Sequence, residues 1–132
     1  MATPRPTQDS NVPSSILISN VRYIFNKIEE VTLLLNQHVV NIAVFVETWL
    51  SSETPNDPLI IGGYTLLRKD RQSGNGGGIA MYIKGSYNYA VISESDVSSL
   101  ISCNSEIFPV YLREFSLLMI GVYHPFWNNL TE

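Results

Sequence analysis

The 132-residue sequence predicts one α/β domain with a mixed sheet, and three observations support this fold class. Hydrophobic residues make up 45% of the chain and charged residues 15%, which is enough apolar surface to bury a core. The first third of the chain alternates between strand-like and helix-like spacing of apolar residues. Several segments of the remainder alternate apolar and polar residues, as antiparallel strands do.

The opening unit is predicted to be a β-α-β unit that spans Ile16 to Val46. Residues 16–18 and 42–46 are short, branched and apolar, which is typical of buried strands, and residues 22–38 have the spacing of an amphipathic helix. The unit covers 31 residues, close to the roughly 30 of a strand-helix-strand crossover, so its two strands should be parallel. Asn20 and Glu47 follow the last apolar residue of each strand and are therefore expected at one edge of the sheet, where open α/β sheets bind ligands.

After Leu50 the chain is predicted to be mostly β. A turn-rich loop, SSETPNDP, is followed by five expected strands and by a polar segment, 93–105, that is expected to be a loop in which VSSLIS could form a helical turn. Residues 1–15 are rich in Pro, Ser and Thr, so they are expected to be a disordered tail before a domain at 16–132. The expected strands are 64–68, 79–84, 87–92, 107–112 and 117–123.

Composition limits the classes of partner. The formal charge is -4 and the isoelectric point is near 5.1, which excludes a global positive field, so a contact with a polyanion needs a local patch or a bound cation. Cys103 is the single cysteine, which excludes an internal disulfide, fits a reducing intracellular compartment and favours a buried structural thiol over a nucleophile. No segment approaches the roughly 18 continuous apolar residues of a membrane helix.

Glu47 is the first candidate for chemistry. A carboxylate directly after five buried apolar residues is costly unless a cation or hydrogen-bond donors compensate it. Mg²⁺ prefers carboxylate oxygens and water and often takes only one or two protein carboxylates. Asn20 could donate to a phosphate oxygen or orient a carboxylate at the same edge. The alternative is an ordinary surface glutamate at a strand end.

Two further candidates end the last expected strand. In LLMIGVYHP, the proline stops the ladder and leaves Tyr123 and His124 at its tip. Both side chains could hydrogen-bond a phosphoryl oxygen, and His124 could carry a proton or a positive charge. The alternatives are a tyrosine half-packed at a core edge and a surface histidine.

The densest basic cluster is Arg68-Lys69-Asp70-Arg71, just before a glycine run at 74–78. Arg68 and Arg71 are either a phosphate-backbone contact or a solvated strand end, and the sequence does not separate the two. The glycine run lacks the Lys-Ser or Lys-Thr and the following helix of a phosphate-binding loop. It is predicted to be a hairpin whose glycines supply positive φ or close backbone approach.

Four segments together resemble a known family: ISNVR, NIAVFVETWL, GYTLLRKDRQSGNGGGIAMYIK and IGVYHP. They are similar to the first half of the endonuclease domain of non-LTR, LINE-type retrotransposons, a member of the endonuclease/exonuclease/phosphatase superfamily with a DNase I-like fold. The resemblance implies Mg²⁺-dependent (or Mn²⁺-dependent) hydrolysis of a DNA phosphodiester by a nuclear protein that carries a reverse transcriptase downstream. It implies that Asn20 belongs to the active-site network, Glu47 binds the metal and Tyr123 contacts the phosphate. His124 stands where these families often have arginine.

The resemblance also implies what should follow. The family continues to a Gly-Asp-x-Asn motif and a Ser-Asp-His motif, and neither occurs in these 132 residues. The expectation is therefore an incomplete DNase I-like sandwich, a fragment with little or no nuclease activity by itself. A non-catalytic module that binds nucleic acid or protein is the alternative. A phosphoinositide or sphingolipid substrate within the same superfamily is a third possibility.

Overall fold

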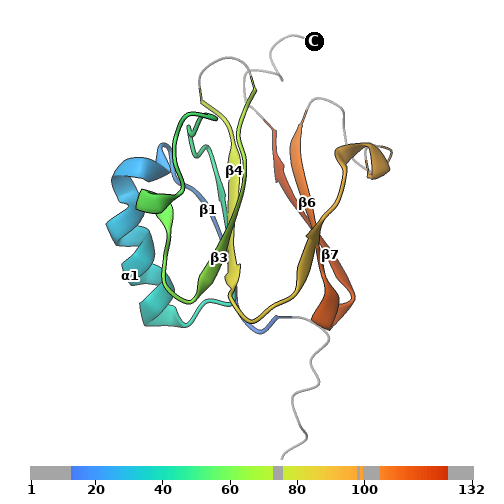
Figure 1. The fold of residues 1–132 in the computed structure, drawn as a ribbon, viewed down its shortest axis with the longest axis horizontal. Helices are drawn as coiled ribbons and strands as arrows, with labels where there is room; N and C mark the ends of the chain where they lie inside the picture. The colour runs from blue at the N-terminus through green and yellow to red at the C-terminus, as the bar shows by residue number, and fades with distance from the viewer. Residues whose placement is uncertain (1–12, 73–75, 98, 100–104, 125–132) are drawn as a thin grey trace, which may run out of the picture.

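The computed structural model describes residues 13–72, 76–97, 99 and 105–124, and Figure 1 shows their arrangement. In this part of the chain a four-stranded sheet in the order β1-β2-β4-β3 faces a three-stranded sheet in the order β5-β6-β7, and one helix, α1, covers the outer face of the first sheet. The elements are β1 (Ile16–Asn20), η1 (Ile24–Lys27), α1 (Ile28–His38), β2 (Ile42–Val46), η2 (Asp57–Leu59), β3 (Tyr64–Lys69), β4 (Ile79–Lys84), β5 (Tyr89–Val91), η3 (Glu94–Asp96), β6 (Glu106–Leu112), η5 (Arg113–Phe115) and β7 (Leu117–Tyr123).

The predicted β-α-β unit is confirmed, with two corrections at its boundaries. β1 and β2 are parallel, and β1 continues past residue 18 to Asn20. The helix expected from residue 22 instead begins as a 3₁₀ turn at Ile24. Arg22 and Tyr23 have φ values of 47° and 72°, outside the right-handed helical region, and the amide of Tyr23 donates to the carbonyl of Glu47 at 2.9 Å. The backbone after β1 therefore bonds to the loop after β2 before the helix begins.

The strands place their ends at one border, called here the rim. Asn20 pairs with Val46, Val46 with Ile79, and Ile79 with Lys69, so all four strands of the first sheet contribute one end to it. In the second sheet the corresponding pair is Glu106 and Tyr123. The rim lies at the top of Figure 1.

Two apolar layers hold this arrangement together. One lies between α1 and the first sheet, and the other lies between the two sheets. The sheets approach closely at Gly121, where a Cβ atom would lie 3.1 Å from both Ile79 Cγ2 and Met81 Cε. The first layer is built on Ile24, Val31, Leu35, Phe45 and Tyr82, and the second on Val44, Ile79, Met81, Phe108 and Leu112.

Some of the segments discussed from the sequence lie outside the residues that the structure describes. Of the expected tail, residues 1–12 lie outside the described residues, whereas the Ser15 carbonyl accepts hydrogen bonds from the amides of Asn41 and Ile42 at 3.0 and 3.2 Å. Cys103 and most of the expected loop segment VSSLIS also lie outside the described residues. In the part of the chain that is described, none of the helices has the length and apolar character needed to cross a bilayer.

Tyr82 gives a prediction about alkaline pH. Its side chain is fully buried, its hydroxyl donates to the Leu59 carbonyl at 2.7 Å, and burial raises its pKa to about 12. Because the phenol of the unfolded chain ionises near the ordinary tyrosine pKa of 10.0, the stability that comes from keeping it neutral is present below that pH and is lost as the pH rises toward 12. Tyr82→Phe should lower the free energy of unfolding by about 1 kcal/mol at pH 8 and remove most of this alkaline loss. Urea denaturation at pH 8, 10 and 11.5 measures both, and an identical alkaline loss in the variant would contradict the assignment.

Candidate active site at the rim

Glu47 lies at the first position after β2 and is held by hydrogen bonds. Its φ of 61° turns the chain out of the strand, and its Oε1 accepts a hydrogen bond from the backbone N–H of Gly77 at 2.8 Å. The hydroxyl of Tyr123 also hydrogen-bonds this carboxylate. Asn20 ends the neighbouring parallel strand in register with Val46, so the amide and the carboxylate lie at the same border. Two of the three predicted catalytic residues are thus in contact, and the third ends the adjacent strand.

Tyr123 is suited to donate a hydrogen bond at neutral pH. Burial raises the pKa of its phenol, and the negative charge of Glu47 and the hydrogen bond to it raise the pKa further. The phenol therefore stays protonated well above pH 7. A protonated phenol next to a carboxylate is a donor that could serve a phosphoryl oxygen as well.

Glu106 is a rim residue that the sequence reasoning missed. It begins β6 directly opposite Tyr123, its Oε1 accepts the N–H of Gly78 at 2.8 Å, and its Oε2 accepts the Nε–H of Arg71 at 2.7 Å. A second guanidinium nitrogen of Arg71 completes a salt bridge with the same oxygen. The β6-β7 hairpin register could have revealed the position of Glu106. When Leu112 pairs with Leu117 across the turn, residue 106 lies opposite residue 123.

The glycine run works as the sequence predicted, as a hairpin with special backbone geometry. Gly76, Gly77 and Gly78 have φ values of 78°, 68° and 92°, and a side chain at Gly77 would overlap the guanidinium of Arg71. This conformation turns two successive amides toward the two rim carboxylates. The run therefore supplies hydrogen-bond donors at the rim.

The predicted substrate-binding residues are placed differently from one another. Arg71 lies at the rim in its salt bridge with Glu106. His124 follows β7, and its Nδ1 lies 3.2 Å from the hydroxyl of Ser105. Arg68 points to the other side of the first sheet, where its side chain is only 14% exposed. Its guanidinium donates to the carbonyls of Ser51 and Thr54, to Asn56 Oδ1 and to both oxygens of Asp70, at 2.7 to 3.2 Å.

These contacts predict a structural role for Arg68. Arg68→Ala should lower the free energy of unfolding by about 2 kcal/mol, because it removes charge-assisted hydrogen bonds that tie the loop after β2 to β3. Arg68→Lys should recover only part of this loss, since an ammonium cannot reproduce the planar fork. Urea denaturation measures the change. Full stability of Arg68→Ala together with weakened DNA binding would instead place this residue in the binding surface.

Glu47 is a ligand of the kind that a magnesium ion prefers. Mg²⁺ is held by one or two carboxylates and completes its shell with water and substrate phosphate, and Glu47 offers one carboxylate at the border where Asn20 ends its strand. The negative charge of Glu106 is already compensated by its salt bridge with Arg71. Within the described ranges, no three His, Cys, Asp or Glu side chains gather as a metal-binding group. The residues present therefore fit an ion that draws most of its ligands from water and substrate.

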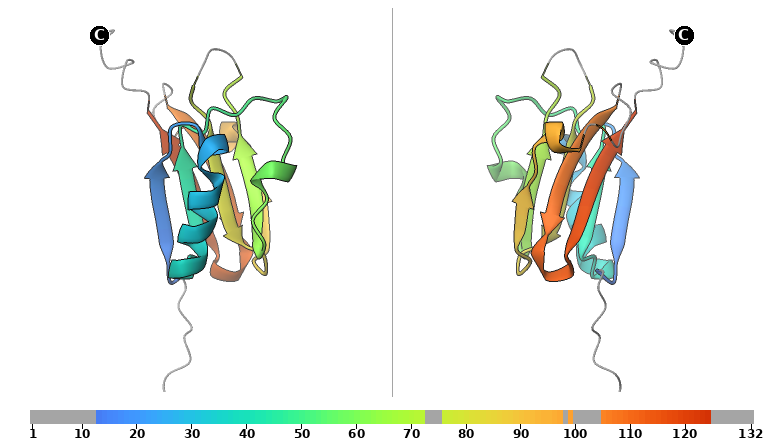
Figure 2. Two further views of the ribbon diagram at one scale, coloured as in Figure 1. Left: turned by 90° about the vertical axis from the view of Figure 1, so that its left-hand side faces the viewer. Right: turned by 90° about the vertical axis from the view of Figure 1, so that its right-hand side faces the viewer.

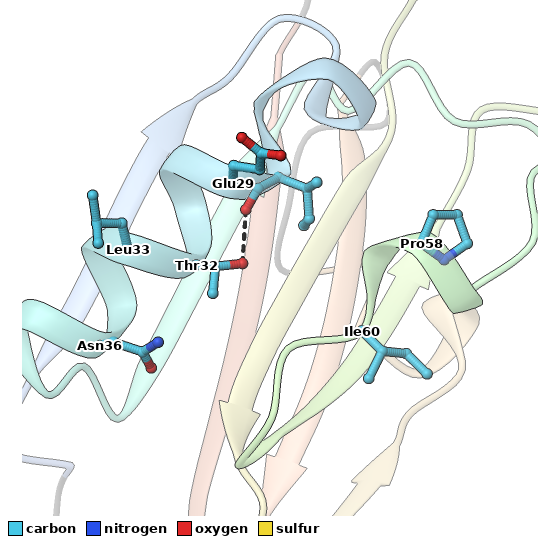
Figure 3. Close-up of a pocket in the computed structure, with 7 residues that line it drawn as sticks. Glu29, Thr32, Leu33, Asn36, Pro58 and Ile60 are labelled. Atoms are coloured by element: carbon cyan, nitrogen blue, oxygen red, sulfur yellow. Dashed lines mark hydrogen bonds between the residues drawn. The ribbon is translucent and has the colours of Figure 1, made fainter.

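Two hollows help to locate binding surfaces. One of about 420 Å³ borders the rim and is polar, with Arg68, Lys69 and Arg71 in its lining. The other, of about 390 Å³, lies between α1 and η2, and Figure 3 shows its lining, which includes Leu33 and Ile60 and none of the rim residues. The candidate site is therefore placed at the rim and not at the hollow beside α1.

Comparison with known proteins identifies similar folds among solved structures. No family model and no curated protein matches the chain. Among solved structures, an AP endonuclease from Archaeoglobus fulgidus is similar with a TM-score of 0.53 and 18% identity, over 82% of this chain and 40% of that one. The AP endonuclease LMAP from Leishmania major is similar with a TM-score of 0.58 and 16% identity, over 95% of this chain and 45% of that one.

The chain thus spans less than half the length of both of these endonucleases. At these identities the similarity concerns the fold alone. It agrees with the two facing sheets, the parallel β1-β2 pair and the outer helix. The chain has the α/β architecture of the DNase I-like fold, as the sequence predicted.

Proposed function

We propose that this chain is part of a Mg²⁺-dependent DNA endonuclease of the LINE-type retrotransposon class, which hydrolyses a phosphodiester bond of its target strand. The observation that carries the proposal is the contact between Glu47 and Tyr123 at the border where Asn20 also ends its strand. The retrotransposon class is supported by the sequence resemblance, in which GYTLLRKDR precedes the glycine hairpin and ETWL comes before both. The fold of the AP endonucleases is consistent with a DNA substrate.

Each rim residue has a distinct role in this proposal. Glu47 would hold the metal ion, Mg²⁺ or Mn²⁺, and Asn20 would orient the phosphate or the Glu47 carboxylate. Tyr123 would donate a hydrogen bond from its hydroxyl to a nonbridging phosphoryl oxygen. When bound, the cation polarises the phosphoryl group and offsets the charge that develops during hydrolysis. Arg71 and His124 lie where they could contact the flanking phosphates.

The chain by itself is proposed to bind DNA and to nick it weakly or not at all. Within the described ranges, Glu47 does not belong to a group of three or more potential metal ligands. A single carboxylate holds a divalent ion weakly, and hydrolysis also needs a group that activates water. The remaining ligands and the base are proposed to come from the rest of an endonuclease domain, in a nuclear protein that also carries a reverse transcriptase.

The open sheet edges support a larger sandwich. β1 and β7 are edge strands, and Figure 2 shows them at the same side of the molecule. Ile18 on β1 is 72% exposed, and Leu118 and Val122 on β7 are also exposed. Apolar residues along two adjacent edges are what further strands and helices would cover in a complete domain.

A plasmid-nicking assay tests the proposal. Supercoiled plasmid is incubated with Mg²⁺ and either this chain or a protein that also carries the downstream half of an endonuclease domain of this class. We expect open circles from the longer protein, lost in EDTA, and little nicking from this chain. Absence of nicking by the longer protein would contradict the endonuclease proposal, and efficient nicking by this chain would contradict the need for further residues.

A second candidate function is a module that binds nucleic acid without cleaving it. The observation that favours this alternative is the polar hollow at which Arg68, Lys69 and Arg71 gather. In the free chain each of these cations is paired with a carboxylate, Asp70, Glu94 and Glu106 respectively, so a phosphate would compete with these pairs. Binding to labelled duplex DNA should then weaken steeply as salt rises and should not require Mg²⁺. Binding that depends on Mg²⁺ and on Glu47 would favour the endonuclease.

A further inference from the structure

Three aromatic rings are exposed together beside the rim. Tyr23, Phe25 and Trp49 are 38%, 40% and 46% exposed. The rings of Tyr23 and Trp49 are stacked with centroids 6.0 Å apart and planes 27° apart, and those of Tyr23 and Phe25 with centroids 6.3 Å apart and planes 18° apart. The three rings therefore form a continuous, nearly parallel stack with Tyr23 in the middle, here called the aromatic stack, and each ring is partly exposed to solvent.

The backbone holds this stack next to Glu47. The amide of Tyr23 donates to the Glu47 carbonyl at 2.9 Å, and the amide of Trp49 donates to the Gly77 carbonyl at 2.9 Å. Trp49 is two residues from Glu47, so their Cα atoms lie within about 7 Å of each other. A nucleotide with its phosphate at Glu47 would thus have its base within reach of these rings.

The conformation that presents the rings is unfavourable for the isolated loops. Tyr23 and Trp49 have φ values of 72° and 59°, and their neighbours Arg22 and Glu47 have 47° and 61°. Residues other than glycine adopt this region of φ only at a free-energy cost. That cost is not recovered by burying the rings, since each remains more than a third exposed. Backbone hydrogen bonds from Tyr23 to Glu47 and from Trp49 to Gly77 hold this conformation, in which the rings stay exposed.

The chemistry of the stack fits a nucleobase. Bases stack on flat aromatic faces in a manner that tolerates any sequence, and the neighbouring Arg22 is exposed and positively charged beside them. Bases inside a duplex are already stacked on one another and do not present their faces. The stack therefore favours a base that has left the duplex or that belongs to a single strand.

We propose that Tyr23, Phe25 and Trp49 form a stacking surface for an unpaired nucleobase of a DNA strand whose phosphate lies at Glu47. This inference rests on the proposed function, which supplies the phosphate site. It adds a substrate class, namely DNA with unpaired bases next to the phosphate that is bound.

Fluorescence anisotropy with three labelled DNA ligands separates stacking from phosphate binding. The ligands are a 12-residue oligothymidylate, an abasic oligonucleotide with the same number of phosphates, and a duplex, all in buffer with Ca²⁺ in place of Mg²⁺. The wild-type chain is expected to bind oligothymidylate about tenfold more tightly than the abasic strand, because stacking contributes to the first ligand alone.

Four variants test whether the aromatic stack causes the preference for oligothymidylate over the abasic strand. Tyr23→Leu and Trp49→Leu should bind oligothymidylate no better than the abasic strand, with abasic binding unchanged. Tyr23→Phe keeps the ring and should bind like wild type, and Ile60→Ala is a matched control, because Ile60 is exposed and apolar but lies at the hollow beside α1. Unchanged thermal unfolding of the leucine variants establishes that they are folded.

The outcomes distinguish this inference from the proposed function. Equal affinity of the wild type for oligothymidylate and the abasic strand would overturn the stacking surface and leave the phosphate site intact. Equal losses for both ligands in the leucine variants would also overturn it, by showing that the rings only support the loop. If the wild type binds none of the three ligands, the stacking surface and the proposed function fall together.

Discussion

Glu47→Gln is expected to lower the rate of Mg²⁺-dependent DNA nicking at least about a hundredfold, in the form of the protein that nicks. The substitution removes the negative charge that holds the cation. It keeps one carbonyl oxygen, which can still accept the hydrogen bond from the Gly77 amide. The rate of conversion of supercoiled to open-circular plasmid, measured over a range of Mg²⁺ concentrations, gives the size of the loss.

Two control variants sharpen this result. Glu53→Gln removes an exposed carboxylate from the neighbouring loop and should leave nicking unchanged. Glu47→Asp keeps the charge on a shorter side chain and should retain more activity than Glu47→Gln, most visibly at high Mg²⁺ concentration. A Glu47→Gln protein that nicks at the wild-type rate would exclude this carboxylate as a metal ligand.

Gly78→Ala is expected to lower the free energy of unfolding by about 3 kcal/mol. Gly78 has a φ of 92°, which strains any other residue, and an added Cβ atom would overlap the buried Oγ1 of Thr48. The same glycine links the two sides of the rim, because its carbonyl accepts from the Thr48 amide and its amide donates to Glu106. Urea denaturation followed by circular dichroism measures the change.

A double-mutant cycle separates the two causes. Thr48→Ala removes the hydroxyl, which finds no hydrogen-bond partner among the residues that the structure describes. In that background Gly78→Ala should retain the cost of its φ but lose the cost of overlap, so the penalty should fall by about half. Gly62→Ala is the matched control, since nothing lies within 4 Å of its added Cβ and its φ is not positive. An equal penalty in both backgrounds would contradict the close packing of Gly78 against Thr48.

The parts of the fold that depend on the spacing of apolar residues and glycines along the chain could be predicted from the sequence. The apolar runs at 16–18 and 42–46 with a helical spacing between them specify a parallel pair, and the pair brings residues 20 and 47 to one border. The glycine run was also predictable, because positive φ and close backbone approach are what glycine uniquely permits. These features depend on neighbours in sequence or on a single crossover.

The features that were missed depend on contacts between distant segments. In the sequence, Glu106 is a polar residue just before an expected strand. It belongs to the rim because it accepts hydrogen bonds from Arg71 and Gly78, which are 35 and 28 residues away. Arg68 belongs to the same basic cluster as Arg71, yet strand alternation sends the two to different surroundings. The start of the helix was predicted too early because positive φ at Arg22 and Tyr23 is set by bonding to the loop after β2.

Paramagnetic broadening by Mn²⁺ in a ¹⁵N NMR spectrum tests most directly whether the rim binds a divalent cation. Mn²⁺ is titrated into the labelled chain at low substoichiometric levels, with Mg²⁺ as the diamagnetic reference. Amide signals of Asn20, Glu47 and Tyr123 should broaden first in the wild type, and this pattern should vanish in Glu47→Gln. Broadening centred on another surface, or a rim pattern that persists in Glu47→Gln, would contradict a cation site built on Glu47.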